Sequence, residues 1–256
     1  MRELHSLATK FMVIGLQEMH GNDAIALLHN AGILRSHVLI SSHPVDRIGI
    51  VKGDSGGVGF LIHRGLSVKG DDGSLIPLLS LPPQSLQPYL VVWVPGRAAS
   101  IRVWDPSGTK STFVYDVHNY GLSVSDMTRL EVGFKSDIGH VKSDPMHTSL
   151  LLMGDFNLQP PDEPKIKVDT PSCTGTFHNS IGPFCGRWNV IFDQCTEIKF
   201  PQPNHFCSAT NSLNKLTRIF VFVSRSVLPM LAHQAGVVND PIFYHAKTLS
   251  DHAPSF

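Results

Sequence analysis

The stretch Leu150–Pro160, LLLMGDFNLQP, places Asp155 and Asn157 directly after a glycine at the end of an apolar run. A short apolar run that ends at turn-forming residues predicts a buried strand, here over 148–155. Side chains two residues apart on a strand point to the same face, so Asp155 and Asn157 are expected to face the same way. Asp155 can then take up a proton while Asn157 holds a phosphate oxygen or a metal-bound water. A turn after a core strand is the alternative interpretation of GDFN.

Three further segments carry potential catalytic or metal-binding residues at the end of an apolar strand or in a loop. Each is weak alone, but their order along the chain is informative. They are Met12–His20 (MVIGLQEMH), which ends near Glu18; Val114–Leu122 (VYDVHNYGL), with His118 and Asn119; and Leu249–Pro254 (LSDHAP), with Asp251 and His252.

Taken in order, these segments resemble the endonuclease/exonuclease/phosphatase superfamily, the fold of DNase I and the apurinic-site repair nucleases. The chain looks most like the endonuclease domains of non-LTR (LINE-type) retroelements. Two more blocks add to the resemblance, GGVGFLIHRG at Gly56–Gly65 and PNHFCSATNSLNKLTRIFVFVS at Pro203–Ser224. The resemblance runs from about Phe11 to Phe256. It implies one domain over 1–256, a four-layer α/β sandwich in which two mostly antiparallel sheets pack together between helices.

The resemblance also implies roles for the site residues. Glu18 and Asp251 would lie at a Mg²⁺ or Mn²⁺ ion, because hard divalent cations prefer carboxylate oxygens. Asp155 would activate or orient water, and His252 would stabilise charge that develops on the phosphate. Asn119 and Asn157 would position that phosphate. His118 either matches the second catalytic histidine of the DNase I branch or only lines the cleft.

The chain departs from the family pattern in two places. The first strand of the family, which carries an asparagine that supports the metal, has no counterpart, since residues 1–10 contain no Asn. In the penultimate block, Thr217 stands where an aspartate that orients the catalytic histidine is expected. With the end at Phe256, these departures predict a domain that is incomplete at both termini, and catalysis that is impaired.

Composition sets the remaining limits. The 256 residues carry a formal net charge of zero, so DNA binding has to rely on a local basic face. Four cysteines lack a CxxC pair, which disfavours structural zinc. No apolar run is long enough to span a membrane, and no feature indicates an obligate protein partner. We therefore expect a soluble, intracellular protein, nuclear if it acts on chromosomal DNA.

Secondary structure was predicted from periodicity and turn signals. A helix capped by Ser123 or Ser125 is expected, since Met127, Leu130 and Phe134 recur at steps of three and four. Residues 65–89 are expected to be loop-rich and 159–185 to form an irregular insertion. Helix is predicted for 22–31, and strands for 11–16, 37–41, 58–63, 89–94, 100–104, 112–117, 188–192 and 218–224.

The favoured function is a metal-dependent phosphodiester hydrolase, a DNA endonuclease of the retroelement type that contacts the phosphate backbone. Two alternatives stay open. The first is a phosphatase or phosphodiesterase of the same fold that acts on a small phosphoester. The second is an inactive relic that keeps the fold and at most weak nucleic-acid binding.

Overall fold

The computed structural model divides the chain into two compact units, 1–154 and 155–256. Each is described by itself, and the prediction of a single domain over 1–256 stays a prediction. The described residues are 2–17, 19, 28–42, 57–82, 89–119, 122–156, 165–167, 188, 190–191, 194–198, 205–207, 212–214 and 219–223.

The first sheet of unit 1–154 has three antiparallel strands in the order β1-β3-β2. They are β1 (Val13–Gln17), β2 (His37–Ser42) and β3 (Val58–His63). Gln17 and Ser42 both lie opposite Val58. The last residues of β1 and β2 and the first residue of β3 therefore lie at the same end of the sheet. The three strands agree with the sequence predictions to within two residues.

The second sheet of this unit has the order β9-β8-β7-β4-β5, with β6 also paired to β7. Strands β6, β7 and β8 form the predicted antiparallel meander. The bounds are β4 (Ser67–Lys69), β5 (Leu75–Pro77), β6 (Leu90–Val94), β7 (Ala98–Trp104), β8 (Ser111–His118) and β9 (Thr148–Asp155).

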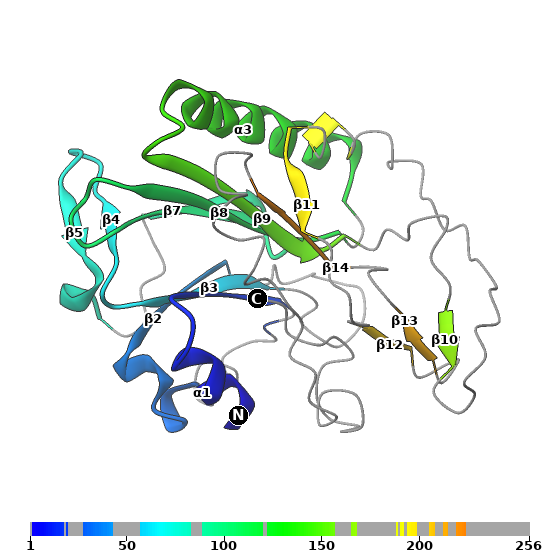
Figure 1. Ribbon diagram of the computed structural model, residues 1–256, viewed down its shortest axis with the longest axis horizontal. Helices are drawn as coiled ribbons and strands as arrows, with labels where there is room; N and C mark the ends of the chain where they lie inside the picture. The colour runs from blue at the N-terminus through cyan, green and yellow to red at the C-terminus, as the bar shows by residue number, and fades with distance from the viewer. Residues whose placement is uncertain are drawn as a thin grey trace, which may run out of the picture. The chain divides into compact units, whose positions relative to one another are not determined.

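Alternating side chains divide the core of this unit into layers. Val38, Ile40 and Phe60 of the first sheet pack with Ile101 and Val114 of the second. The residues between them in sequence point outward, and Leu39 and Leu61 pack with Ala8 of α1 (Arg2–Ala8) and with η1 (Ile33–Arg35). Figure 1 shows α1 and α3 on opposite sides of the two sheets. These layers are those of the predicted α/β sandwich.

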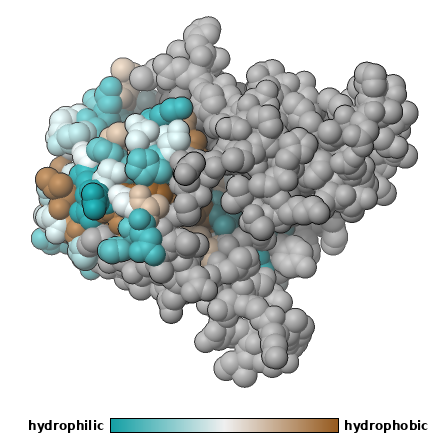
Figure 2. Space-filling view, turned by 90° about the horizontal axis from the view of Figure 1, so that it is seen from below, coloured by the Kyte–Doolittle hydropathy of each residue, from teal (hydrophilic) through white to brown (hydrophobic). Residues whose placement is uncertain are grey.

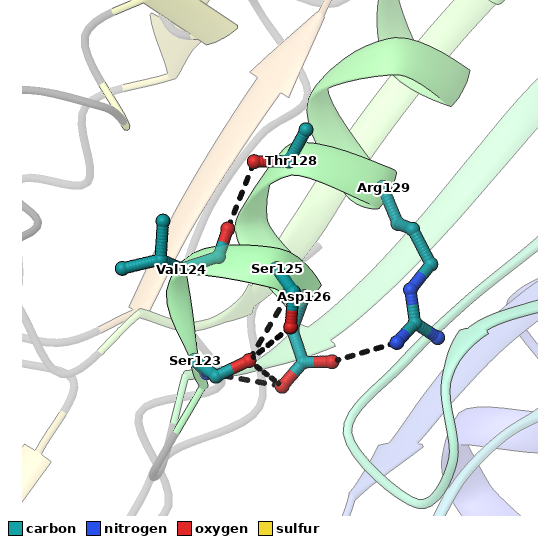
Figure 3. A network of polar contacts seen from close by, with 6 residues as sticks. All are labelled: Ser123, Val124, Ser125, Asp126, Thr128 and Arg129. Carbon is teal, nitrogen blue, oxygen red and sulfur yellow. Dashed lines mark hydrogen bonds and ion pairs between the residues drawn. The ribbon is translucent and has the colours of Figure 1, made fainter.

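Helix α3 (Val124–Ser143) covers the outer face of the second sheet, where Phe134 meets the ring of Tyr115 edge-on. Its first turn is closed by a capping box. The Ser123 hydroxyl accepts a hydrogen bond from the Asp126 backbone N–H, and the Asp126 carboxylate accepts one from the Ser123 N–H (Figure 3). Arg129 forms an ion pair with Asp126 in the next turn. The predicted cap and apolar face are both confirmed.

Unit 155–256 is described in part. Its strands are short: β10 (Lys165–Lys167), β11 (Thr196–Ile198), β12 (His205–Cys207), β13 (Ser212–Asn214) and β14 (Ile219–Val223). β13 pairs with β10 and β12, and β11 pairs with β14, which confirms the strand predicted at 218–224. Phe156 and Trp188 are fully buried and meet edge-on, with ring centroids 4.9 Å apart.

The structure corrects one local prediction and adds to others. Trp188, Val190 and Ile191 are helical, so the strand predicted at 188–192 is wrong. The region 65–89 is predicted to be loop-rich, and within it the structure adds the short β4–β5 hairpin and η2 (Leu78–Ser80). Helix α1 was not predicted. Of the predicted helix at 22–31, residues 28–30 are helical and 22–27 lie outside the described residues.

The surface seen from below mixes hydrophilic and hydrophobic residues over the described part of the chain (Figure 2). Among the described residues, no helix is both long and apolar enough to cross a membrane.

Candidate functional site

One end of unit 1–154 collects the ends of β1, β8 and β9, three of the segments that the sequence analysis singled out. We call this end the rim and define it by Gln17, Ser42, Gly57, Arg97 and His118. Two hydrogen bonds join the sheets there. The Gly57 N–H donates to the Gly96 carbonyl at 2.9 Å, and the Gly96 N–H donates to the Ser42 hydroxyl at 3.1 Å. The β6–β7 turn is thereby fixed against the first sheet.

A third link at the rim runs from β1 to β8. The Gln17 side-chain Nε2 donates to Asp116 Oδ1 at 2.6 Å and to the Val117 carbonyl at 2.9 Å. Asp116 is 1% exposed, and burial raises the pKa of its carboxyl to about 8, although the hydrogen bond from Gln17 opposes this in part. Asp116 is therefore a neutral acid at pH 7.

His118 is the last residue of β8 and forms a buried pair with Arg97. Arg97 Nη1 lies 2.9 Å from His118 Nδ1, and the His118 N–H donates to the Arg97 carbonyl at 2.7 Å. A guanidinium has donors and no acceptor, so Nδ1 must accept and cannot carry a proton. This contact fits the tautomer that carries its proton on Nε2.

The end of β9 reaches the rim through a glycine. Gly154 has φ +151°, and a Cβ on this residue would lie 1.9 Å from the Val117 carbonyl oxygen. Only glycine allows so close an approach between β9 and β8. Asp155, the next residue and the last of β9, is buried. The glycine of the GDFN motif therefore sets where this carboxylate leaves the sheet.

Three of the predicted site residues can be placed. His118 and Asn119 lie at the end of β8, and Asp155 ends β9. Glu18, Asn157, Thr217, Asp251 and His252 lie outside the described residues. Their predicted convergence with Asp155 stays a prediction. In the described part of the chain, no group of three or more His, Cys, Asp or Glu side chains is arranged to hold a metal.

The sequence analysis missed Gln17, Asp116 and Arg97. A signal for Asp116 was present, because it alternates with His118 in YDVH and so shares its face of the strand. Arg97 gave no signal, since a single arginine after Pro-Gly reads as a turn residue. Its role depends on a contact with a residue 21 positions away.

No protein-family model matches the chain, and no curated protein matches it in sequence at a significant level. Solved structures do match. The 3′–5′ exonuclease NExo from Neisseria meningitidis is 19% identical, with a TM-score of 0.53 over 99% of this chain and 92% of that one. ANGEL2, a 2′,3′-cyclic phosphatase, is 12% identical, with a TM-score of 0.54 over 99% and 82%.

A second NExo structure, of the 3′ phosphatase from Neisseria bound to a product DNA hairpin, is 17% identical, with a TM-score of 0.52 over 99% and 91%. An endonuclease/exonuclease/phosphatase family protein from Bacteroides thetaiotaomicron is 13% identical, with a TM-score of 0.54 over 98% and 84%. At these identities the likeness defines the fold. This chain has the α/β sandwich of the DNase I-like enzymes.

Proposed function

We propose that the chain is a divalent-metal-dependent phosphodiester hydrolase, and within that class a DNA endonuclease of the retroelement type. The observation that carries the proposal is the rim. There Gln17 is hydrogen-bonded to β8 just before Glu18 in sequence, and Gly154 brings the end of β9 against Val117. Phosphodiester hydrolysis needs a base, phosphate-binding amides and a metal-binding carboxylate to converge, and the proposal places this convergence at the rim.

Each residue has a distinct task in this proposal. Asp155 accepts the proton of the attacking water or orients that water. Asn119 and Asn157 hold phosphate oxygens, and His118 donates to one from Nε2 because Arg97 occupies Nδ1. His252 stabilises charge on the phosphoryl group. Glu18 and Asp251 offer the hard oxygen donors that Mg²⁺ or Mn²⁺ prefers, and the ion when bound supplies charge stabilisation.

The retroelement assignment rests on the sequence block at Pro203–Ser224 and on the order of the motifs. A neighbour of the same fold that binds a DNA product is consistent with a nucleic-acid substrate. The net charge of zero predicts few phosphate contacts, so DNA binding should be weak and should depend only slightly on salt concentration.

A phosphatase that acts on a small phosphoester is the second candidate function. The structural neighbours favour keeping it, because they include a 2′,3′-cyclic phosphatase and a 3′ phosphatase as well as an exonuclease. The two candidates share the rim and differ in substrate. An assay panel of DNA and small phosphoesters separates them.

The test is a plasmid-nicking assay on the purified chain with Mg²⁺, with Mn²⁺ and with EDTA. We expect nicking with either ion, none with EDTA, and a loss of at least ~10²-fold in Asp155→Ala. The matched control is Asp71→Ala, which removes an exposed carboxylate in the β4–β5 turn and should nick like the parent. Nicking that survives EDTA would contradict the metal. A folded chain that turns over neither DNA nor any phosphoester would be an inactive relic.

A further inference from the structure

The contact between Gln17 and Asp116 is a polar bridge between the two sheets of unit 1–154. One carboxamide nitrogen uses both of its N–H groups, on Asp116 Oδ1 and on the Val117 carbonyl. Two acceptors on successive residues hold the amide in a single orientation. The position of the end of β1 relative to β8 is therefore fixed both parallel and perpendicular to that strand.

The bridge is closely packed and uncharged. A Cβ on Gly15 would lie 2.7 Å from Met153 Cε and 3.3 Å from Asp116 Oδ2, so the sheets meet here around a glycine. Among the described atoms, Asp116 Oδ2 has no hydrogen-bond partner. Burial favours the acid form of this carboxyl over the anion. Its side-chain partner is the amide of Gln17, and backbone hydrogen bonds at Leu16 and Val117 also act on it.

The bridge lies beside position 18 in the sequence. Gln17 comes directly before it, and the N–H of Met19, directly after it, donates to the Gly57 carbonyl at 3.2 Å. Both neighbours of position 18 are thus tied to fixed backbone at the rim. On the other side of the bridge, Val117 comes two residues before Asn119.

We propose that Asp116 is a positioning residue, which acts through Gln17 to set where Glu18 and Asn119 are presented to a metal-bound phosphate. This inference rests on the proposed function, which gives Glu18 and Asn119 their tasks. Groups that orient metal ligands without touching the metal commonly change metal affinity by ~10–100-fold when removed. Displacement of a reacting group by ~1 Å costs about 10²-fold in rate.

The experiment compares four variants of the full chain with the parent. Asp116→Ala and Gln17→Leu break the bridge from either side. Asp116→Asn keeps the size, the neutrality and an acceptor oxygen. The matched control is Tyr115→Phe, which removes a hydrogen bond to Asp137 from the neighbouring residue of β8, on the face under α3. Mg²⁺ binding is measured by calorimetry, and kcat and KM by nicking at saturating Mg²⁺.

We expect Asp116→Ala and Gln17→Leu to bind Mg²⁺ at least ~10-fold more weakly, with kcat lowered more than KM is raised. Asp116→Asn should stay within about threefold of the parent, because it keeps an acceptor oxygen for the Gln17 amide. Tyr115→Phe should lower the unfolding temperature and leave Mg²⁺ affinity unchanged.

If Gln17→Leu and Asp116→Ala had the same Mg²⁺ affinity and kcat as Tyr115→Phe, the inference would be overturned. The proposed function would then still stand. If Asp116→Ala does not fold, Gln17→Leu decides, and Gln17→Met decides if neither folds. Met keeps the approximate length of the side chain but has no N–H donor, so it should weaken Mg²⁺ binding at least ~10-fold, while unchanged binding would overturn the inference. A parent chain that binds no Mg²⁺ would refute the proposed function, and the inference with it.

Discussion

Asp116 shows how a single buried carboxyl makes stability depend on pH. Burial raises its pKa from 3.8 to about 8 in the folded protein. Between these values the folded state keeps the proton and the unfolded state releases it, so stability falls as pH rises through this window. The unfolding free energy from urea denaturation should drop by a few kcal/mol between pH 5 and pH 8.5. Asp116→Asn should remove most of this dependence, and an equally steep fall in that variant would assign it to other groups.

The pair of Arg97 and His118 fixes a tautomer. Arg97→Met removes the donor at Nδ1, so this contact no longer holds the imidazole proton on Nε2. Nitrogen NMR of histidine-labelled protein should show one tautomer, with the proton on Nε2, in the parent and a mixture in Arg97→Met. Arg102→Met is the control, because Arg102 lies on β7, the strand that follows Arg97, and stacks on Trp104 and Phe113. A mixture already present in the parent would refute the tautomer assignment.

At the scale of elements, β9 depends on the glycine that ends its apolar run. Gly154→Ala would place a methyl group on the Val117 carbonyl and strain the backbone at φ +151°. We expect a loss of at least ~2 kcal/mol in unfolding free energy, together with weaker nicking, because Asp155 must move. Gly139→Ala in α3 is the control. Its added methyl meets nothing within 4 Å and should stabilise the helix by ~0.5–1 kcal/mol.

Elements with a long periodic pattern were predictable, and short ones were not. Helix α3 followed from the spacing of Met127, Leu130 and Phe134, and its cap from Ser123. The apolar run at 188–192 was ambiguous, since a short run fits a buried strand and a helix equally well. The strands β4 and β5 have three residues each, too few to show an alternation.

The cap of α3 gives an element-scale test of this reasoning. Ser123→Ala removes the acceptor of the Asp126 N–H and should lower the unfolding free energy by ~1 kcal/mol. Ser125→Ala, in the same turn, should cost much less, because Ser125 caps no backbone N–H in the described contacts. Equal losses in urea denaturation would mean that Ser125 shares the cap.

For the whole molecule, the family resemblance implied the sandwich, and the apolar runs predicted the strands at whose ends His118, Asn119 and Asp155 lie. The sequence did not predict what holds those ends together. Gln17, Asp116 and Arg97 act through contacts between residues 21 to 100 positions apart, and no local pattern encodes such a pairing. The rim is therefore a property of the packed sheets.

The last prediction concerns the cooperativity of the chain. The boundary between the two units falls inside β9, between Gly154 and Asp155, and Phe156 packs on Trp188 directly afterwards. Because melting β9 must also displace Phe156, we expect both units to unfold in one transition.

Tryptophan fluorescence can follow each unit separately, since Trp188 is the sole tryptophan of unit 155–256. The variant Trp188→Phe reports from unit 1–154 alone, and the double variant Trp93→Phe, Trp104→Phe reports from Trp188 alone. In each variant the fluorescence midpoint should coincide with that of far-UV circular dichroism, which is the test of a two-state transition. A fluorescence midpoint several degrees apart from the circular dichroism midpoint in either variant would show that the units unfold separately, against the expectation of one domain over 1–256.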